Sequence, residues 1–280
     1  MDISTSHVHV ASAFRHYLIA SDFDQTLSFN DSGQVLAELL GVQGFEEKVA
    51  GLADSNLVQQ GGELAYLIRH DPEFRAVRRE HLVEAGRRVR LKREIPALLR
   101  FFERGFAGHQ FTFAVVSAAP RPVVESALAG LVSPDRIFAS EFAFDPLSHE
   151  VTAVRKVPAG YGKVAVLEEL ERRWHIAPDR TVYVGDGSSD VHVMLHVNNR
   201  DGYTIAVSEN RQLARIARTT VLSDSTFSIL APLLKHVMRL STSDVRAVFE
   251  AHGLALETWD HAATDRIVVG PTSSASALPG

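Results

Sequence analysis

Short runs of apolar and β-branched residues recur along this chain, and helical patterns separate them. Four such runs are 17–23 (YLIASDF), 111–117 (FTFAVVS), 181–184 (TVYV) and 203–207 (YTIAV). Continuous apolar runs of this length are typical of strands that are buried on both faces. Helical patterns occupy the segments 122–131, 162–174, 189–196, 210–217 and 226–238. The alternation predicts an α/β fold, with a doubly wound, Rossmann-like parallel sheet covered by helices.

The interval between the first two strands is much longer than a crossover requires. A crossover between parallel strands needs about a dozen residues or somewhat more, whereas the segment 25–110 lies between these two. Apolar residues recur there at helical spacing, at Leu36, Leu39 and Leu40 and again at Leu91, Ile95, Leu98, Leu99 and Phe102. We therefore expect a small helical cap domain at 32–107, inserted into a core of 1–31 and 108–240 and lying over the carboxyl edge of the sheet.

The remaining segments are simpler to interpret. Residues 140–157 are expected to form a hairpin or loop around Asp145-Pro146. Residues 241–280 are expected to form a C-terminal extension, with one helix at 243–252 and a mobile tail over the last ten residues. This extension either supports a dimer or covers the edge of the sheet.

Two carboxylates follow the first predicted strand, in Asp22-Phe23-Asp24-Gln25-Thr26. Side chains two apart on a strand point to the same side, so these carboxylates converge at the end of a buried strand. Their repulsion is relieved if a cation lies between them, and carboxylate oxygens are the ligands that Mg²⁺ prefers. A solvated turn is the alternative. An EF-hand loop is excluded, because Leu27 stands where that loop needs glycine.

A second acidic motif, 185–190 (GDGSSD), follows the strand at 181–184. It is not a dinucleotide-binding fingerprint, because Asp190 occupies the position of the third glycine. Asp186 follows a strand end and is expected to complete the metal site, while Asp190 begins the next helix and orients Asp186 or Lys163. An ordinary glycine turn with an acidic N-cap is the alternative, and it explains Asp190 but not Asp186.

Two further residues fit the same site. Ser117 ends the second strand, where its hydroxyl and the following backbone N–H are placed to bind a phosphate oxygen. Lys163 lies near the start of the helix at 162–174, where its ammonium group would neutralise charge shared by a phosphate and a nucleophile. Each residue alone is uninformative. Four signals in this order, three of them at predicted strand ends, indicate one site.

Composition excludes several classes of protein. The net charge of −5 argues against non-specific nucleic-acid binding. The absence of cysteine excludes disulfides, thiolate nucleophiles and iron–sulfur clusters, and it fits a cytoplasmic location. No apolar run approaches the length needed to cross a bilayer, and residues 1–20 do not resemble a signal peptide. We expect a cytoplasmic protein with no nucleic-acid or membrane partner. The match of 30–32 (NDS) to a glycosylation sequon is interpreted as chance.

The order of DFDQT, VVSAA, GK and GDGSSD resembles the haloacid dehalogenase superfamily of phosphohydrolases, over about residues 17–240. A cap between the first two motifs resembles the phosphoserine-phosphatase-like branch. The resemblance implies that Asp22 is the nucleophile and Asp24 the general acid/base, with Asp190 in support. It also implies an Mg²⁺ site and a phosphate-binding set: Asp22, the Asp24 backbone carbonyl and Asp186 for the metal, and Thr26, Ser117, Ala118 and Lys163 for the phosphate.

The implied activity is hydrolysis of a small phosphorylated metabolite through an aspartyl phosphate. Carbon–halogen cleavage is not expected, because the dehalogenases lack the acid/base that Asp24 matches. Ala118, Ala119 and Pro120 stand where phosphoserine phosphatases usually have a Gly-Gly pair, so phosphoserine itself is not the expected substrate. Two alternatives stay open: a phosphotransferase or mutase with the same intermediate, and a non-catalytic metal- or phosphate-binding regulatory module.

Three other sets of residues carry weaker signals. Gln59, Gln60 and Arg75 are candidates for substrate contacts in the cap. His192 and His196 have the spacing of a transition-metal pair, but without a third ligand they are interpreted as core or surface histidines. A basic cluster is interpreted as a solvated helix face, with a lure for anionic substrates as the alternative; it comprises Arg75, Arg78, Arg79, Arg87, Arg88, Arg90, Lys92 and Arg93.

Overall fold

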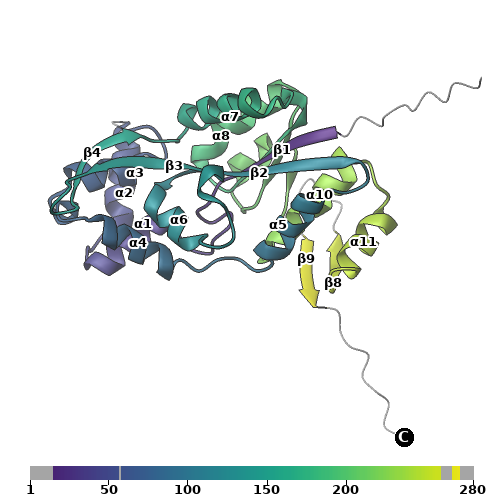
Figure 1. The fold of residues 1–280 in the computed structure, drawn as a ribbon, viewed down its shortest axis with the longest axis horizontal. Coiled ribbons are helices and arrows are strands. Elements are labelled where there is room, and N and C mark those ends of the chain that lie inside the picture. The colour runs from purple at the N-terminus through teal and green to yellow at the C-terminus, as the bar shows by residue number, and fades with distance from the viewer. Residues whose placement is uncertain (1–14, 57, 260–266, 272–280) are drawn as a thin grey trace, which may run out of the picture.

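A seven-stranded sheet forms the centre of the computed structural model, which describes residues 15–56, 58–259 and 267–271 (Figure 1). The strand order is β4-β3-β2-β1-β5-β6-β7, and every pair is parallel except β3 and β4. The strands are β1 (Arg15–Ser21), β2 (His109–Pro120), β3 (Ile137–Phe144), β4 (Val151–Lys156), β5 (Thr181–Gly185), β6 (Tyr203–Ala206) and β7 (Thr219–Thr220). All four predicted strands are confirmed, and so is the hairpin around Asp145-Pro146.

Helices occupy most of the remaining described chain. The longer ones are α1 (Ser32–Leu40), α2 (Phe45–Ser55), α3 (Glu63–His70), α4 (Arg79–Arg88), α5 (Ile95–Arg104), α6 (Arg121–Ala127), α7 (Tyr161–Trp174), α8 (Val191–Asn199), α9 (Arg211–Ile216) and α11 (Thr242–Glu250). The short turns are η1 (Pro72–Phe74), η2 (Pro134–Arg136), η3 (Pro178–Arg180), η4 (Ser188–Asp190), η5 (Thr226–Ile229), α10 (Leu230–Pro232) and η6 (Leu233–Val237). No helix within the described residues is both long and apolar enough to cross a bilayer.

Alternation along β1 explains why helices cover both faces of the sheet. Tyr17 and Ile19 are buried against α5, η5, α10 and α11 on one face. Leu18 and Ala20 are buried against α7, α8 and α9 on the other. Successive side chains of a strand point to opposite faces, so an unbroken apolar strand requires cover on both sides. The predicted doubly wound α/β fold is confirmed.

The helical insertion after β1 lies at one end of the molecule, where α1 to α4 gather beside the β3–β4 hairpin (Figure 1). Leu36, Phe45, Phe74 and Leu82 of the insertion are buried in one apolar cluster, which continues into the core through residues such as Val123 of α6. The last helix of the predicted cap range, α5, has different packing partners. Helix α5 packs on the sheet, with Phe101 and Phe102 buried in the same cluster as Ile19. The cap boundary at 107 therefore remains a prediction, and the insertion away from the sheet consists of α1 to α4.

Helix α4 anchors this insertion to the core through a close approach to α6. A Cβ atom on Gly86 would lie 2.3 Å from the Val123 carbonyl oxygen and 2.7 Å from the Ser126 Cβ. The Ser126 hydroxyl also donates to the Val83 carbonyl oxygen, at 2.7 Å. The two helices can therefore meet at this distance only because position 86 has no side chain.

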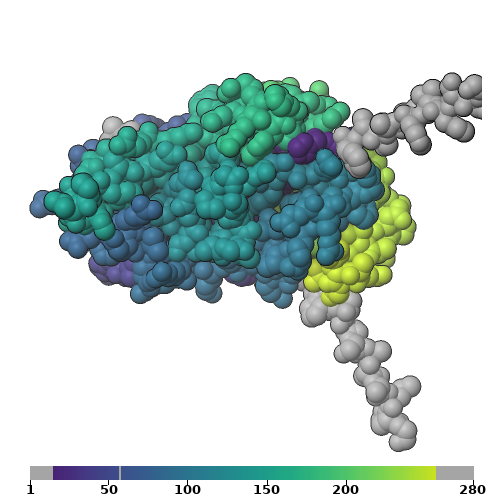
Figure 2. All heavy atoms as spheres, in the orientation of Figure 1, coloured from purple at the N-terminus to yellow at the C-terminus, as the bar shows by residue number. Residues whose placement is uncertain are grey.

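The C-terminal segment contains one feature that the sequence did not predict. Helix α11 confirms the helix expected at 243–252, and it lies at the end of the molecule opposite α1 to α4 (Figure 2). An antiparallel pair follows it, β8 (Leu254–Trp259) and β9 (Ile267–Pro271). The expected mobile tail falls at 271–280, of which 272–280 lie outside the described residues. The helix expected at 226–238 is divided into η5, α10 and η6, around Pro232, which has no backbone N–H to continue a regular helix.

Candidate active site

Acidic side chains meet at the carboxyl ends of β1 and β5, where the strand order changes direction. The chain continues from β1 toward β2 and β3 on one side, and β5 to β7 lie on the other. Ligands in open α/β sheets bind at such switch points. The Asp22 backbone N–H donates to the Val184 carbonyl oxygen at 2.9 Å and so extends the ladder beyond β1. The β1 chain then turns through Gln25, which has a φ of 53°.

A buried lysine links two of the carboxylates. The Lys163 Nζ lies 2.8 Å from the Asp22 Oδ2 and 2.6 Å from the Asp190 Oδ1. Burial opposes the positive charge of Lys163, but the carboxylates of Asp190 and Asp22 outweigh this effect and raise the pKa of the ammonium group. Burial raises the pKa of Asp22 to about 6, and the charge of Lys163 opposes that rise. At neutral pH the Asp22 carboxylate is therefore ionised and held by a cation.

Asp190 serves as the anchor of this arrangement. Its Oδ1 accepts hydrogen bonds from the Lys163 ammonium group at 2.6 Å and from the Tyr183 hydroxyl at 2.7 Å. Its Oδ2 accepts from the backbone N–H groups of Asp186 at 3.0 Å and Gly187 at 3.1 Å. Four donors occupy a carboxylate that has about four acceptor positions. These bonds hold the 186–187 loop and the Lys163 ammonium group in place.

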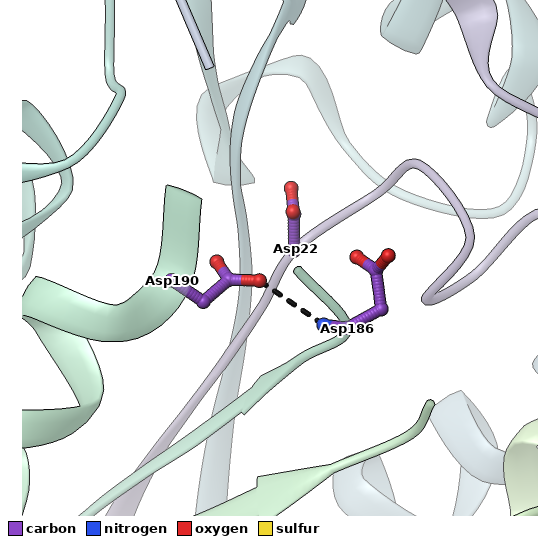
Figure 3. A group of neighbouring side chains, drawn as sticks. All are labelled: Asp22, Asp186 and Asp190. Carbon is purple, nitrogen blue, oxygen red and sulfur yellow. Dashed lines mark hydrogen bonds between the residues drawn. The ribbon is translucent and has the colours of Figure 1, made fainter. Parts of the chain in front are cut away.

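Asp186 completes a group of three carboxylates that converge from two strand ends and the start of α8 (Figure 3). One carboxylate oxygen from each of Asp22, Asp186 and Asp190 lies within 4.8 Å of the others. The Thr26 hydroxyl donates to the Asp186 Oδ1 at 3.2 Å. Burial, followed by the charges of Asp22 and Asp190, raises the pKa of Asp186 to about 8. The pocket thus holds more negative than positive charge.

This donor set fits a hard divalent cation. Carboxylate oxygens are the preferred ligands of Mg²⁺, which is usually held by one or two carboxylates. Because four donors already occupy Asp190, the oxygens of Asp22 and Asp186 are the ones that suit a metal. Within the described parts of the chain, this is the one group of His, Asp or Glu side chains with metal-ligand spacing. His192 and His196 are not in it: His192 stacks on Tyr161 with 4.3 Å between ring centres, and His196 lies 3.5 Å from Glu168.

Asp24 lies in a different setting from Asp22. Its Oδ1 accepts from the Ser32 backbone N–H and its Oδ2 from the Ser32 hydroxyl, both at 2.8 Å. Burial raises the pKa of Asp24 well above its usual range, and the charges of Asp31 and Asp22 add to the rise. The Asp24 carboxylate therefore points to the first residue of α1 and stays out of the group around Lys163. Only its backbone carbonyl was assigned to the metal site, and that oxygen accepts from the Thr26 N–H at 2.6 Å.

A cavity of about 280 Å³ lies between these residues and the helical insertion. Asp22, Asp24, Asp186, Ser117 and Ala118 line its core side. The Ser117 hydroxyl accepts from the Ala119 N–H at 3.1 Å, which leaves its proton available for donation. The opposite wall consists of Gln60, two acidic residues and several apolar ones: Asp31, Gly33, Phe45, Val49, Ala53, Gln60, Gly61, Glu63 and Leu64. Among the described residues, no Lys, Arg or His is part of the lining.

The predicted phosphate-binding residues divide into two groups. Ser117 and Ala118 line the cavity, but Thr26 and Lys163 are almost fully buried behind it. The Thr26 hydroxyl contacts Asp186, and Lys163 contacts the two carboxylates described above. A direct contact of either residue with phosphate remains a prediction.

The weaker candidates also separate in the structure. Gln60 lines the cavity, Gln59 lies in the adjacent loop, and Arg75 is exposed and outside the lining. Members of the basic cluster form exposed ion pairs, including those of Arg78 with Glu150 and of Arg88 with Glu84. Such pairs are typical of a solvated helix face.

Several residues of the site were not identified from the sequence. Ser32 holds Asp24, Tyr183 holds Asp190, and Asp31 and Glu63 line the cavity. A signal for the first of these was present. The segment 30–32 contains the N-cap of α1, where the Asp31 side chain accepts from the Gln34 N–H at 2.9 Å. An Asp side chain at a helix N-cap is a common sequence pattern, and here it marks the start of α1 at Ser32.

Comparison with known proteins agrees with this geometry. The sequence model of the family described as haloacid dehalogenase-like hydrolase matches residues 19–195, which is more than half of the chain. No curated protein is similar enough in sequence to count as a match.

Solved structures with this fold include two of phosphoserine phosphatase. A substrate-bound complex has a TM-score of 0.63 and 21% identity, over 77% of this chain and 97% of that one. A phospho-aspartyl intermediate analogue has a TM-score of 0.63 and 22% identity, over 77% and 98%. A HAD family hydrolase from Salmonella enterica subsp. enterica serovar Typhi has a TM-score of 0.60 and 17% identity, over 72% and 66%. At these identities the likeness concerns the fold.

Proposed function

The chain belongs to the family of haloacid dehalogenase-like hydrolases, and from that premise we propose that it hydrolyses small phosphomonoesters through an aspartyl phosphate on Asp22. One observation carries this proposal. Asp22 and Asp24 line the same cavity but differ in their charged neighbours. Lys163 holds the Asp22 carboxylate at 2.8 Å, whereas Asp24 contacts the neutral Ser32 and has a raised pKa. Two acidic groups with separated pKa values are suited to two different roles in one reaction.

In the first step, a carboxylate oxygen of Asp22 attacks the phosphorus atom. The bond between phosphorus and the leaving alcohol oxygen breaks, and Asp24 donates its proton to that oxygen. In the second step, the Asp24 carboxylate takes a proton from a water molecule, and the oxygen of that water attacks phosphorus. The bond between phosphorus and Asp22 then breaks, which releases inorganic phosphate and restores both side chains.

The other groups at the site bind and orient the reactants. Ser117 and Ala118 line the cavity, which supports the assignment of the Ser117 hydroxyl and the Ala118 N–H as donors to phosphate oxygens. Asp22 and Asp186, with the Asp24 carbonyl oxygen, would hold Mg²⁺. When bound, Mg²⁺ would offset the repulsion between an anionic nucleophile and a phosphate dianion. Ser32 aims Asp24, and Asp190 aims Lys163 and the loop that bears Asp186.

The lining supports a particular class of leaving group. Because the described lining has no basic side chain, a second anionic group on the alcohol would have no cationic partner there. Asp31 and Glu63 face the cavity from the insertion, so an uncharged or cationic alcohol suits this wall better. O-Phosphoserine and O-phosphoethanolamine differ only in the carboxylate, which phosphoserine has and phosphoethanolamine lacks. Their rates of hydrolysis therefore measure the effect of a second anionic group. We expect kcat/KM to be at least about tenfold higher for phosphoethanolamine.

The activity is tested by phosphate release from a panel of small phosphomonoesters, with Mg²⁺ and with a chelator. The natural protein is expected to release phosphate only with Mg²⁺, and Asp22→Asn to lose about 10⁴-fold or more in kcat. Asp24→Asn is expected to lose about 10²- to 10⁴-fold. Circular dichroism of both variants checks that they fold. Release of phosphate by Asp22→Asn at the natural rate would contradict the proposal.

A further inference from the structure

The loop between α2 and α3 packs against the core beside the cavity. Within it, Gly61 has a φ of 90°, and a Cβ atom there would lie 2.8 Å from the Ser189 Cβ and 3.2 Å from the Ala159 Cβ. The loop is also held internally, since the Gly61 N–H donates to the buried Glu63 carboxylate at 2.7 Å. Gln60 and Gly61 line the cavity. This loop, 59–62, therefore closes one side of the cavity and is seated between core segments.

Gln59 is the residue of this loop that contacts helix α7. In the amide orientation that satisfies both of its polar atoms, the Oε1 accepts from the Tyr161 N–H at 2.7 Å. Its Nε2 donates to the Ala159 carbonyl oxygen at 3.3 Å. Tyr161 is the first residue of α7, and the N-cap position before it is Gly160, which has no side chain to offer. Gln59 thus supplies, from the insertion, an acceptor for the first of the N–H groups at the start of α7 that have no partner within the helix.

Gly160 makes this contact possible. A Cβ atom at this position would lie 2.2 Å from the end of the Gln59 amide and 2.8 Å from its Cδ. The φ of 49° at Gly160 is also in the left-handed region that favours glycine. The following N–H groups are bonded within the core, since Gly162 donates to the Ala159 carbonyl oxygen at 2.7 Å and Lys163 to that of Gly160 at 3.1 Å. The absence of a side chain at Gly160 thus leaves space beside the start of α7 for the Gln59 side chain.

We propose that Gln59 is a positioning residue that couples the seating of the 59–62 loop to helix α7, and thereby to Lys163. Lys163 lies two residues after Tyr161, in the first turn of α7. When the loop is seated, the first N–H of the helix is bonded and the turn that carries Lys163 is fixed. When the loop lifts, that N–H loses its acceptor and the turn frays. The link from Lys163 to turnover rests on the proposed function, whereas the link from Gln59 to α7 does not.

Amide hydrogen exchange tests the structural part in the free protein. Gln59→Ala is expected to speed exchange of the Tyr161 N–H by about fivefold, since loss of a helix cap changes the local opening equilibrium by about that factor. Gln59→Glu keeps an acceptor for the Tyr161 N–H and should stay within about twofold of the natural protein. Gln43→Ala is the matched control, because Gln43 is exposed in the same insertion and outside the cavity. Equal exchange in Gln59→Ala and the natural protein, or no rescue by Gln59→Glu, would overturn the proposal.

Turnover of p-nitrophenyl phosphate with Mg²⁺ tests the link to Lys163. Gln59→Ala should lower kcat by about two- to fivefold with KM within about twofold, because Gln59 acts through the lysine. Gln59→Glu should restore kcat, and Gln43→Ala should not change it. A change in KM alone would overturn the coupling to Lys163. If the natural protein has no turnover, the proposed function fails, and the exchange experiment still decides the role of Gln59.

Discussion

Ser32 binds both oxygens of the Asp24 carboxylate, through its backbone N–H and its hydroxyl, each at 2.8 Å. Ser32 is the first residue of α1, so the helix that begins the insertion also orients the proposed general acid. The position of Asp24 therefore depends on the insertion as well as on β1. This dependence gives a specific expectation for Ser32.

We predict that Ser32→Ala lowers kcat for p-nitrophenyl phosphate by about tenfold, because one hydrogen bond to Asp24 is lost and the carboxyl group can rotate. The alkaline limb of the pH–rate profile should move to higher pH, because a donor that lowers the pKa of Asp24 is removed. Ser55→Ala, in exposed surroundings at the end of α2, is the control. An unchanged kcat in Ser32→Ala would show that the orientation of Asp24 does not limit the reaction.

A second prediction concerns the anchor role of Asp190. Asp190→Asn leaves Lys163 with one carboxylate and removes an acceptor from the buried network, so we expect a loss of about 3 kcal/mol in the free energy of unfolding. Tyr183→Phe removes a single donor to the same carboxylate and should cost about 1 kcal/mol. Urea denaturation measures both. Equal effects of the two variants would contradict the central place of Asp190.

A third prediction follows from the pKa values of the metal-free site. Burial raises the pKa of Asp186 to about 8, above the ordinary value of 3.8. A carboxyl group with a raised pKa binds its proton more tightly in the folded state, so its contribution to stability is present below about pH 4 and is lost as the pH rises through 8. The metal-free protein should therefore unfold at a lower temperature at pH 9 than at pH 5. Asp186→Asn should reduce this difference.

A related experiment measures the effect of Mg²⁺ on the unfolding temperature. At pH 8, millimolar Mg²⁺ should raise the unfolding temperature of the natural protein, because the cation binds the folded state. The rise should be absent in Asp186→Asn and present in the surface control Asp201→Asn, which lies outside the site. An equal response of all three proteins to Mg²⁺ would show that the cation binds elsewhere.

A fourth prediction tests the packing of the insertion on the core. Gly86→Ala forces a Cβ atom against the Val123 carbonyl and should lower the free energy of unfolding by about 1–3 kcal/mol. Gly51→Ala is a matched control in α2, where a Cβ atom meets nothing within 4 Å. It should stabilise the protein by up to about 1 kcal/mol through helix propensity. Thermal or urea unfolding that finds the same sign for both variants would contradict the close approach of α4 and α6.

Much of the core of the fold could be predicted from the sequence because β1, β2, β5 and β6 each contain a short apolar run, such as 17–20 in β1 and 113–116 in β2. That pattern arises only where both faces of a strand are covered, and the acidic residues that end β1 and β5 then meet at one edge of the sheet. This argument brought Asp22 and Asp186 together, and Lys163 was added to them from its place near the start of a helix and from the order of the motifs. The distances among them agree with it.

Contacts made across turns could not be predicted in this way. Thr26 points back to Asp186 because the chain turns sharply at Gln25, and Ser32 reaches Asp24 because α1 begins beside that turn. Periodicity describes which face of an element is buried, but it carries no information on how consecutive elements are angled. The same limit applies to α5, whose apolar stripe fits a cap helix and a core helix equally well. The β8–β9 pair was also not predicted from the sequence.

The most direct test of the account is to trap the intermediate. The protein is mixed with p-nitrophenyl phosphate and Mg²⁺, quenched in acid within the first turnovers, digested and analysed by mass spectrometry. We predict a phosphoryl group on the peptide that contains Asp22, formed and lost at rates compatible with turnover and absent from Asp22→Asn. Turnover with no phosphoryl group on that peptide, or with one on another residue, would contradict the assignment of Asp22 as the nucleophile.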